Sequence, residues 1–279
     1  MDNGATLHVA PLSLKSRVPV LSEFMKKLSK ILPILFIIVG ISIAGYPKIS
    51  NWIHVKFQKQ EIVEYESLSS QMSVKEIKAN LEAAKTYNKK LADNHALFYY
   101  PEQLEGYYEI INLSGNGVMG YLTIAKLDIS LPIYHGTDDS VLQKGAGHIE
   151  GSSFPIGGTS EHAVIAAHRG LPSAELFSNL DKMEIGDTFT IRILNRSITY
   201  IVDQIEVVEP TDQSLELVED GKSYCTLLTC TPYGINSHRL LVRGKLESVE
   251  LMDRIQTSDN KMGQNCIGDD QNPLKKIFH

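Results

Sequence analysis

Residues 188–208 read TFTIRILNRSITYIVDQIEVV, and this stretch decides the fold class. Apolar side chains alternate with polar ones along 188–194, the pair Asn195-Arg196 suits a turn, and 197–208 returns rich in isoleucine and valine. A period of two residues is typical of strands, and two such runs joined by a short turn predict a β-hairpin. We therefore predict a mainly β fold.

Further strand-like runs flank this hairpin on both sides, and turn residues separate them. They lie at 121–124, 129–134, 163–167, 224–231 and 239–246. Many short strands over about 140 residues predict a closed barrel or a sandwich. One short helix is expected among them. Its buried face is expected to carry Leu176, Phe177, Leu180 and Met183.

A helix is predicted ahead of the strands. Ser73 and Glu76 have the spacing of a capping box, and apolar residues then recur at threes and fours. This stripe, which we expect to pack on the following domain, comprises Val74, Ile77, Leu81, Ala84 and Leu91. An irregular aromatic stretch, HALFYYPEQLEG, follows at 95–106.

Residues 31–46, ILPILFIIVGISIAGY, carry no charge and predict a transmembrane anchor. A helix of this length reaches only about 24 Å of a ~30 Å hydrocarbon core, and Tyr46 and Trp52 are placed to extend it at the interface. A cleavable signal peptide is the alternative, since Ser42-Ile43-Ala44 loosely fits a cleavage site. Basic residues before the span place the N-terminus in the cytoplasm and the large C-terminal part outside, as in a single-pass cell-membrane protein. These basic residues are Lys15, Arg17, Lys26, Lys27 and Lys30.

Five segments are therefore expected along the chain. They are a cytoplasmic tail without clear structure at 1–30, the anchor or signal peptide at 31–46, a helical stalk and lid-like region at 47–106, the strand-rich catalytic domain at 107–250, and a polar tail at 251–279.

Composition narrows the classes of function. The 279 residues are 43% hydrophobic, enough for one sizeable core. The net charge of −6 without a basic stripe argues against nucleic-acid binding. Of the three cysteines, Cys225 and Cys230 lie five apart in one predicted strand and so face opposite sides, while Cys266 lies in the tail. An odd number outside the cell indicates at least one free thiol.

Cys230 is the candidate nucleophile because it ends a predicted strand just before Thr231-Pro232. A buried structural cysteine is the alternative. His168 also follows a buried apolar strand, and Arg239 begins the last one, so the three can meet at one rim of a barrel. Other histidines compete for the role of base, and for each a solvated or core position is the simpler interpretation. These are His135, His148, His162 and His238.

The three residue types suit acyl transfer together. A thiolate is the nucleophile, an imidazole can protonate the departing amine and deprotonate the incoming one, and a guanidinium offers forked donors to an oxyanion. Neither cysteine has a close partner at zinc spacing, and the glycine pairs are not phosphate loops. We expect no metal and no cofactor.

The motifs around these residues resemble the sortase family. Residues 226–230 read TLLTC and match its TLxTC signature, while 167–170, AHRG, and 237–244, SHRLLVRG, resemble the stretches around its histidine and arginine. GAGHIEG at 145–151, LPSA at 171–174 and CTPY at 230–233 resemble the class C, pilin-polymerising branch. The resemblance covers about 120–246.

This resemblance implies a closed barrel of about eight strands. Together with the segments predicted above, the expected fold is that barrel with short helices, preceded by an N-terminal helical segment and a membrane anchor. It implies cleavage of an LPxTG-like sorting signal between Thr and Gly, with Cys230 forming a thioacyl intermediate. A lysine of a neighbouring pilin subunit would release it as an isopeptide. His168 would act as acid then base, and Arg239 would hold the substrate carbonyl or the oxyanion.

Two departures from the class C pattern stand out. The stretch Phe98-Tyr99-Tyr100-Pro101 lies where relatives carry a lid with an Asp-Pro-aromatic anchor, but it lacks the acidic residue. Many relatives also have a C-terminal membrane span, which is not seen in this sequence.

Two rival functions remain open at this point. One is a wall-anchoring sortase that uses a cell-wall precursor amine, and the other is an inactive pilus-assembly scaffold.

Overall fold

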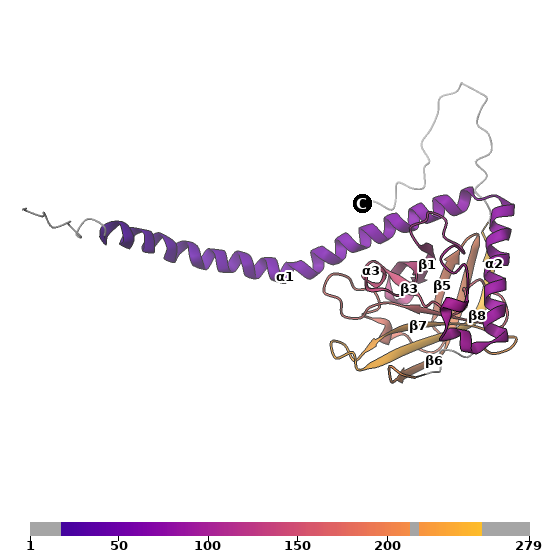
Figure 1. Ribbon diagram of the computed structural model, residues 1–279. Helices are drawn as coiled ribbons and strands as arrows, with labels where there is room; N and C mark the ends of the chain where they lie inside the picture. The colour runs from indigo at the N-terminus through magenta and orange to yellow at the C-terminus, as the bar shows by residue number, and fades with distance from the viewer. Residues whose placement is uncertain (1–17, 213–217, 253–279) are drawn as a thin grey trace, which may run out of the picture.

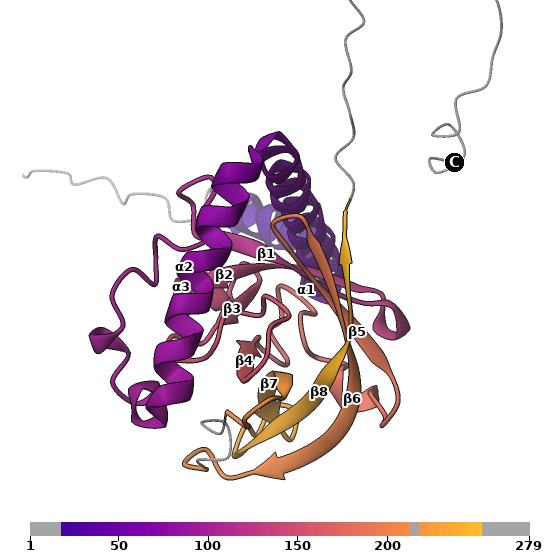
Figure 2. The same ribbon diagram turned by 90° about the vertical axis from the view of Figure 1, so that its right-hand side faces the viewer.

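The protein is an eight-stranded closed β-barrel, seen in a computed structural model that describes residues 18–212 and 218–252. Residues 1–17 and the tail with Cys266 lie outside the described residues. The barrel order is β1-β2-β3-β4-β7-β8-β6-β5 (Figure 2). The strands are β1 (Val118–Ile124), β2 (Ile129–His135), β3 (Ala146–His148), β4 (Glu161–Ala166), β5 (Thr188–Ile193), β6 (Arg196–Val208), β7 (Ser223–Thr231) and β8 (His238–Leu251). The predicted mainly β fold and closed barrel are confirmed.

The hairpin predicted at 188–208 is the pair β5–β6, with Ile193 opposite Arg196 across the turn. Its alternation is explained by burial, since Phe189, Ile191 and Ile193 all point into the core. Strand β3 was not predicted, because a three-residue strand that contains a glycine is too short to show a period. Short elements complete the barrel: α3 (Asp139–Leu142), η4 (Ala125–Leu127) and η5 (Leu180–Lys182).

The short helix predicted around 176–183 is present only as a 3₁₀ turn over its second half. The stretch forms turns followed by the 3₁₀ turn η5. Leu176 has φ +40°, a left-handed conformation that an α-helix cannot include. All four apolar residues assigned to its buried face are nevertheless buried.

Helix α1 (Val18–Gln71) runs without interruption for 54 residues and extends far beyond the barrel (Figure 1). The expectation of a tail without clear structure is therefore wrong for 18–30, where no glycine intervenes and good helix formers such as leucine, lysine and methionine prevail. Exposed apolar side chains cover its N-terminal half, including Ile38 at 56%. Pro47 lies inside the helix, and a proline removes a hydrogen bond and bends the axis.

Helix α2 (Val74–Asp93) begins with the predicted capping box. The Glu76 N–H donates to Ser73 Oγ at 3.2 Å, and the Ser73 N–H donates to Glu76 Oε2 at 2.7 Å. Four residues of the predicted stripe are buried, whereas Val74, in the first turn, is 66% exposed. Asn88 joins this helix to the barrel, because its side chain bonds both the N–H (2.8 Å) and the carbonyl (2.9 Å) of Phe154. Two 3₁₀ turns follow, η2 (His95–Phe98) and η3 (Pro101–Gln103).

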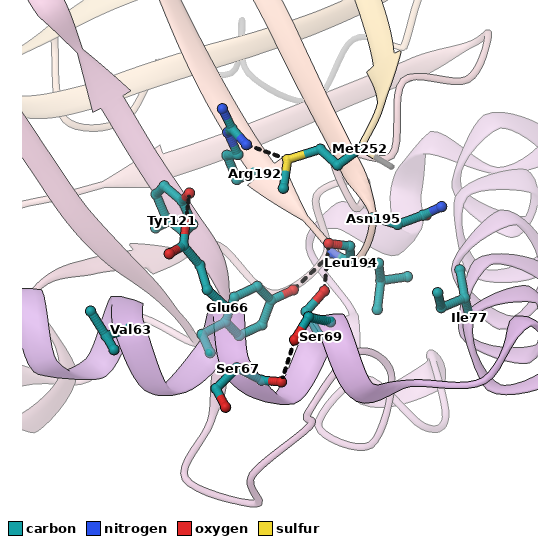
Figure 3. Close-up of a pocket in the computed structure, with 12 residues that line it drawn as sticks. Val63, Glu66, Ser67, Ser69, Ile77, Tyr121, Arg192, Leu194, Asn195 and Met252 are labelled. Carbon is teal, nitrogen blue, oxygen red and sulfur yellow. Dashed lines mark hydrogen bonds between the residues drawn. The ribbon is translucent and has the colours of Figure 1, made fainter. Parts of the chain in front are cut away.

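The C-terminal half of α1 is fixed along the barrel wall. Gln58 Nε2 donates to the Lys144 carbonyl at 3.0 Å. Further on, Ser69 Oγ donates to the Leu194 carbonyl at 2.6 Å, and the Leu194 N–H donates to Tyr65 Oη at 2.8 Å. A hollow of about 400 Å³ lies at this seam, between α1, α2 and the β5–β6 turn (Figure 3). The seam attaches the long helix to the barrel at a defined angle.

Candidate active site

The hydrogen bonds beyond the end of β4 bring two predicted site residues together. β4 runs parallel to β7, and the Ala167 N–H donates to the Leu228 carbonyl at 3.1 Å. Thr229 Oγ1 donates to the Ala167 carbonyl at 2.7 Å. These bonds continue the strand register one residue past β4. The next residue, His168, therefore falls beside Cys230.

Arg239 lies on the other side of Cys230. β8 is antiparallel to β7, and the two residues are direct partners in the ladder. Residues opposite each other in neighbouring strands share a face of the sheet. His168, Cys230 and Arg239 therefore share one face of the wall, and all three are partly exposed. We call this end of the barrel, where β4 and β7 end and β8 begins, the Cys230 rim.

The second thiol of the strand lies on the core face. Cys225 is fully buried, as the strand alternation predicts, and Cys230 is partly exposed. Burial raises the pKa of the Cys225 thiol well above its usual range, because an apolar surrounding disfavours the thiolate. Only Cys230 of the two therefore combines exposure with neighbours suited to acyl transfer.

The guanidinium of Arg239 is held by the loop before β8. Its Nη1 donates to the carbonyls of His238 (3.1 Å) and Asn236 (3.3 Å). His238 itself is within 3.1 Å of Glu209 Oε1 through its Nε2. The backbone at the start of β8 thus holds the Arg239 guanidinium at the Cys230 rim, while Glu209, just after β6, engages the neighbouring His238 imidazole.

Arg169 is a further residue of the site that the sequence pattern does not predict, beyond its place in the AHRG motif. Its side chain is only 8% exposed, and Nη2 lies 2.7 Å from Asp181 Oδ2. Its Nη1 donates to Thr231 Oγ1 at 2.9 Å. Arg169 therefore ties the residue after His168 to the residue after Cys230. An arginine beside a candidate histidine gave no signal for this role, because the two strands that it joins are distant in sequence.

A tyrosine packs over the same loop. Gly170 has φ +77°, and a Cβ there would lie 3.1 Å from the ring of Tyr233. Only glycine fits both the left-handed backbone and the close ring. Tyr233 thereby joins the β7–β8 loop to the loop that carries His168.

The competing histidines have structural roles. His148 is fully buried between Tyr107 Oη (3.0 Å) and the Ser153 carbonyl (2.9 Å), and burial lowers its pKa to about 3. His135 contacts two backbone carbonyls, and His162 Nε2 lies 2.8 Å from Thr226 Oγ1. Within the described ranges, no three or more His, Cys, Asp or Glu side chains are grouped to hold a metal ion.

The aromatic stretch of the lid-like region does not lie over Cys230. The backbone of Phe98 packs against Gly151, which precedes the Ser153–His162 hydrogen bond near the start of β4. His168 lies past the opposite end of that strand. Tyr99 and Tyr100 are 45% and 54% exposed. The stretch therefore leaves Cys230 uncovered in this structure, and Cys230 is partly exposed.

Comparison with known proteins identifies the family. The sortase domain model matches residues 122–247. The crystal structure of sortase C1 from Streptococcus agalactiae is 44% identical with a TM-score of 0.62, covering 68% of this chain and 98% of that one. Sortase C of Streptococcus pneumoniae is 43% identical with a TM-score of 0.60, covering 68% and 97%. Sortase D of Bacillus subtilis (strain 168) is 25% identical over 78% of this chain and 98% of its own length. The chain therefore belongs to the sortase family of cysteine transpeptidases, in its class C branch.

Proposed function

We propose that Cys230 is the nucleophile, His168 the acid and base, and Arg239 the oxyanion partner of a transpeptidase that joins pilin subunits. One observation carries this assignment: the strand register sets Cys230 between the other two on one face of the barrel. Of the two free cysteines in the described part of the chain, Cys225 is buried and Cys230 is partly exposed.

The proposed reaction has two acyl transfers. The Cys230 thiolate attacks the threonine carbonyl of an LPxTG-like signal, and the Arg239 guanidinium faces the resulting oxyanion. Protonated His168 gives its proton to the departing glycine amine, which leaves a thioester. A lysine amine then loses its proton to His168 and attacks the thioester, so that an isopeptide forms and the thiolate is restored.

Pilin is the favoured substrate because two similar solved structures are described by reference to pilin or the pilus. The Streptococcus pneumoniae structure is described in terms of pilin substrate specificity, and a Streptococcus agalactiae relative, 44% identical, is described as pilus-related. The alternative acceptor is the amine of a cell-wall precursor. Purified enzyme supplied with both a pilin and a precursor mimic distinguishes them by which conjugate accumulates.

The proposal includes a membrane anchor at the N-terminus. One described helix region, Met25–Gln71, is long and apolar enough to cross a bilayer. Its apolar part projects away from the barrel (Figure 1). The catalytic domain would then lie outside the cell, tethered by α1.

The decisive test is to trap Cys230. The enzyme is mixed with a sorting-signal peptide, and the thioester and cleavage point are read by mass spectrometry. An adduct on Cys230 that ends at threonine supports the proposal, and the Cys230→Ala variant serves as the control. Absence of any adduct with a folded protein would favour the inactive scaffold.

A further inference from the structure

The two rims of the barrel contact different positions along α1. Asn51 Oδ1 accepts from the Glu175 N–H at 2.9 Å, in the loop that follows His168 and Arg169. The contacts to Leu194 are made by Tyr65 and Ser69, at the β5–β6 turn. That turn is at the opposite rim, because Arg196 pairs with Leu251 at the end of β8 whereas Val208 pairs with Arg239. The Cys230 rim is therefore the one nearer the N-terminal half of the helix.

The length of a membrane span places this rim at the bilayer surface. Lys30 is the last charge before the apolar stretch, and about 20 residues at 1.5 Å each cross a ~30 Å hydrocarbon core. A span that begins at Ile31 therefore ends at about Ser50. The next residue, Asn51, already bonds the Glu175 loop. Lys48 can extend its ammonium to the interface.

Apolar side chains of the Cys230 rim lie exposed beside this point. A hollow of about 530 Å³ separates Pro47 and Lys48 of α1 from the 171–179 loop and Tyr233. Tyr233 is 62% exposed, and Ile235 in the same β7–β8 loop is 71% exposed. Aromatic rings with a polar tip are favoured at membrane interfaces, and an exposed isoleucine gains by leaving water.

From these positions we infer that the β7–β8 loop is a second membrane contact, in which Tyr233 and Ile235 enter the lipid interface and hold Cys230 at the bilayer surface. The occupant is lipid because the loop adjoins the helix at the level where the proposed anchor leaves the hydrocarbon core. This inference rests on that anchor. Its consequence is that the enzyme acts at the bilayer surface, on substrates whose reacting bond lies there.

Tryptophan fluorescence tests the contact in the full-length protein. Trp52 is the only tryptophan, so Trp52→Phe provides a silent background. Ile235→Trp on this background probes the loop, Leu251→Trp is a matched control at the opposite rim with 67% exposure, and Ile38→Trp reports on the anchor. The variants are reconstituted in vesicles whose acyl chains carry bromine close to the headgroups, a short-range quencher.

We expect the vesicles to quench Ile235→Trp and Ile38→Trp strongly, and to leave Leu251→Trp as bright as in vesicles without bromine. Quenching of Ile38→Trp with Ile235→Trp as bright as Leu251→Trp would overturn the loop contact and leave the anchor intact. A bright Ile38→Trp would remove the anchor and the contact together.

A second measurement concerns activity. Ile235→Asp should slow cleavage of a sorting signal fused to a bilayer-embedded helix several-fold more than Leu251→Asp does. Cleavage of the same signal as a soluble peptide by micellar enzyme provides the reference rate for each variant. For each variant, the rate on the bilayer-embedded substrate is divided by the rate on the soluble peptide. An equal quotient for Ile235→Asp and Leu251→Asp would contradict the inference.

Discussion

Replacing Arg169 by methionine tests whether the loop after β4, which carries His168, must be tied to the end of β7, which carries Cys230. Methionine keeps an unbranched, flexible side chain that fills a similar space without the charge. The change removes the hydrogen bond to Thr231 and the ion pair with Asp181. Charge-assisted hydrogen bonds contribute about 1.5–3 kcal/mol. The ion pair adds less than about 1 kcal/mol, because the Asp181 side chain is 48% exposed and screened by water.

We therefore expect Arg169→Met to lower the free energy of unfolding by about 1.5–4 kcal/mol. We also expect kcat to fall about 10²-fold, the typical result of a misplacement of about 1 Å between reacting groups. KM should change little, because Arg169 joins the two loops from a buried position. The assay is cleavage of a fluorogenic sorting-signal peptide, with urea unfolding of the same preparations.

Two variants make this test specific. Asp181→Asn keeps the Thr231 contact and should retain most of kcat. Arg169→Lys keeps the charge without the planar fork and should restore only part of it. If folded Arg169→Met kept kcat within a few-fold of the natural enzyme, the tie would be structural and the reasoning refuted.

Three further predictions concern the thiols, the oxyanion partner and pH. Cys230→Ala should abolish peptide cleavage while Cys225→Ala keeps most of it, since the two thiols face opposite sides; a folded, inactive Cys225→Ala variant would contradict the assignment. Arg239→Lys should lower kcat about 10²–10³-fold, because an ammonium cannot reproduce the fork, and near-normal turnover would leave Arg239 a general electrostatic role. Burial raises the pKa of Glu161 from 4.5 to about 7. Between those values the folded chain holds more protons than the unfolded one, so the free energy of unfolding should fall by about 3 kcal/mol as pH rises through this window. Urea titrations at pH 5 and 8 check this, and Glu161→Gln should show a smaller loss; an equal loss in both proteins would assign the pH dependence to other groups.

Much of the site could be predicted from local pattern. The ends of two strands made His168 and Cys230 candidates, and the start of a third did so for Arg239, because residues at strand ends can meet at a barrel rim. The sortase-like motifs around them then favoured these three over the other cysteines and histidines. Arg169 could not be found in this way. Its role depends on Asp181 and Thr231, which reach it only when β4 and β7 pair in parallel. The place of the 95–106 stretch could not be predicted for a similar reason, since the position of Phe98 depends on how α2 docks on the barrel through Asn88.

The sequence by itself determined the features that arise from short-range periodicity and sterics. Alternation produced the β5–β6 hairpin, the Ser73–Glu76 pair began α2, and the uncharged run at 31–46 defined the apolar part of α1. Only the tertiary structure decided where α1 lies against the barrel, because that depends on single hydrogen bonds such as Asn51 to Glu175 between segments 124 positions apart. These bonds turn the Cys230 rim toward the N-terminal half of the helix. No local pattern encodes that direction, since it follows from the packing of the closed barrel as a whole.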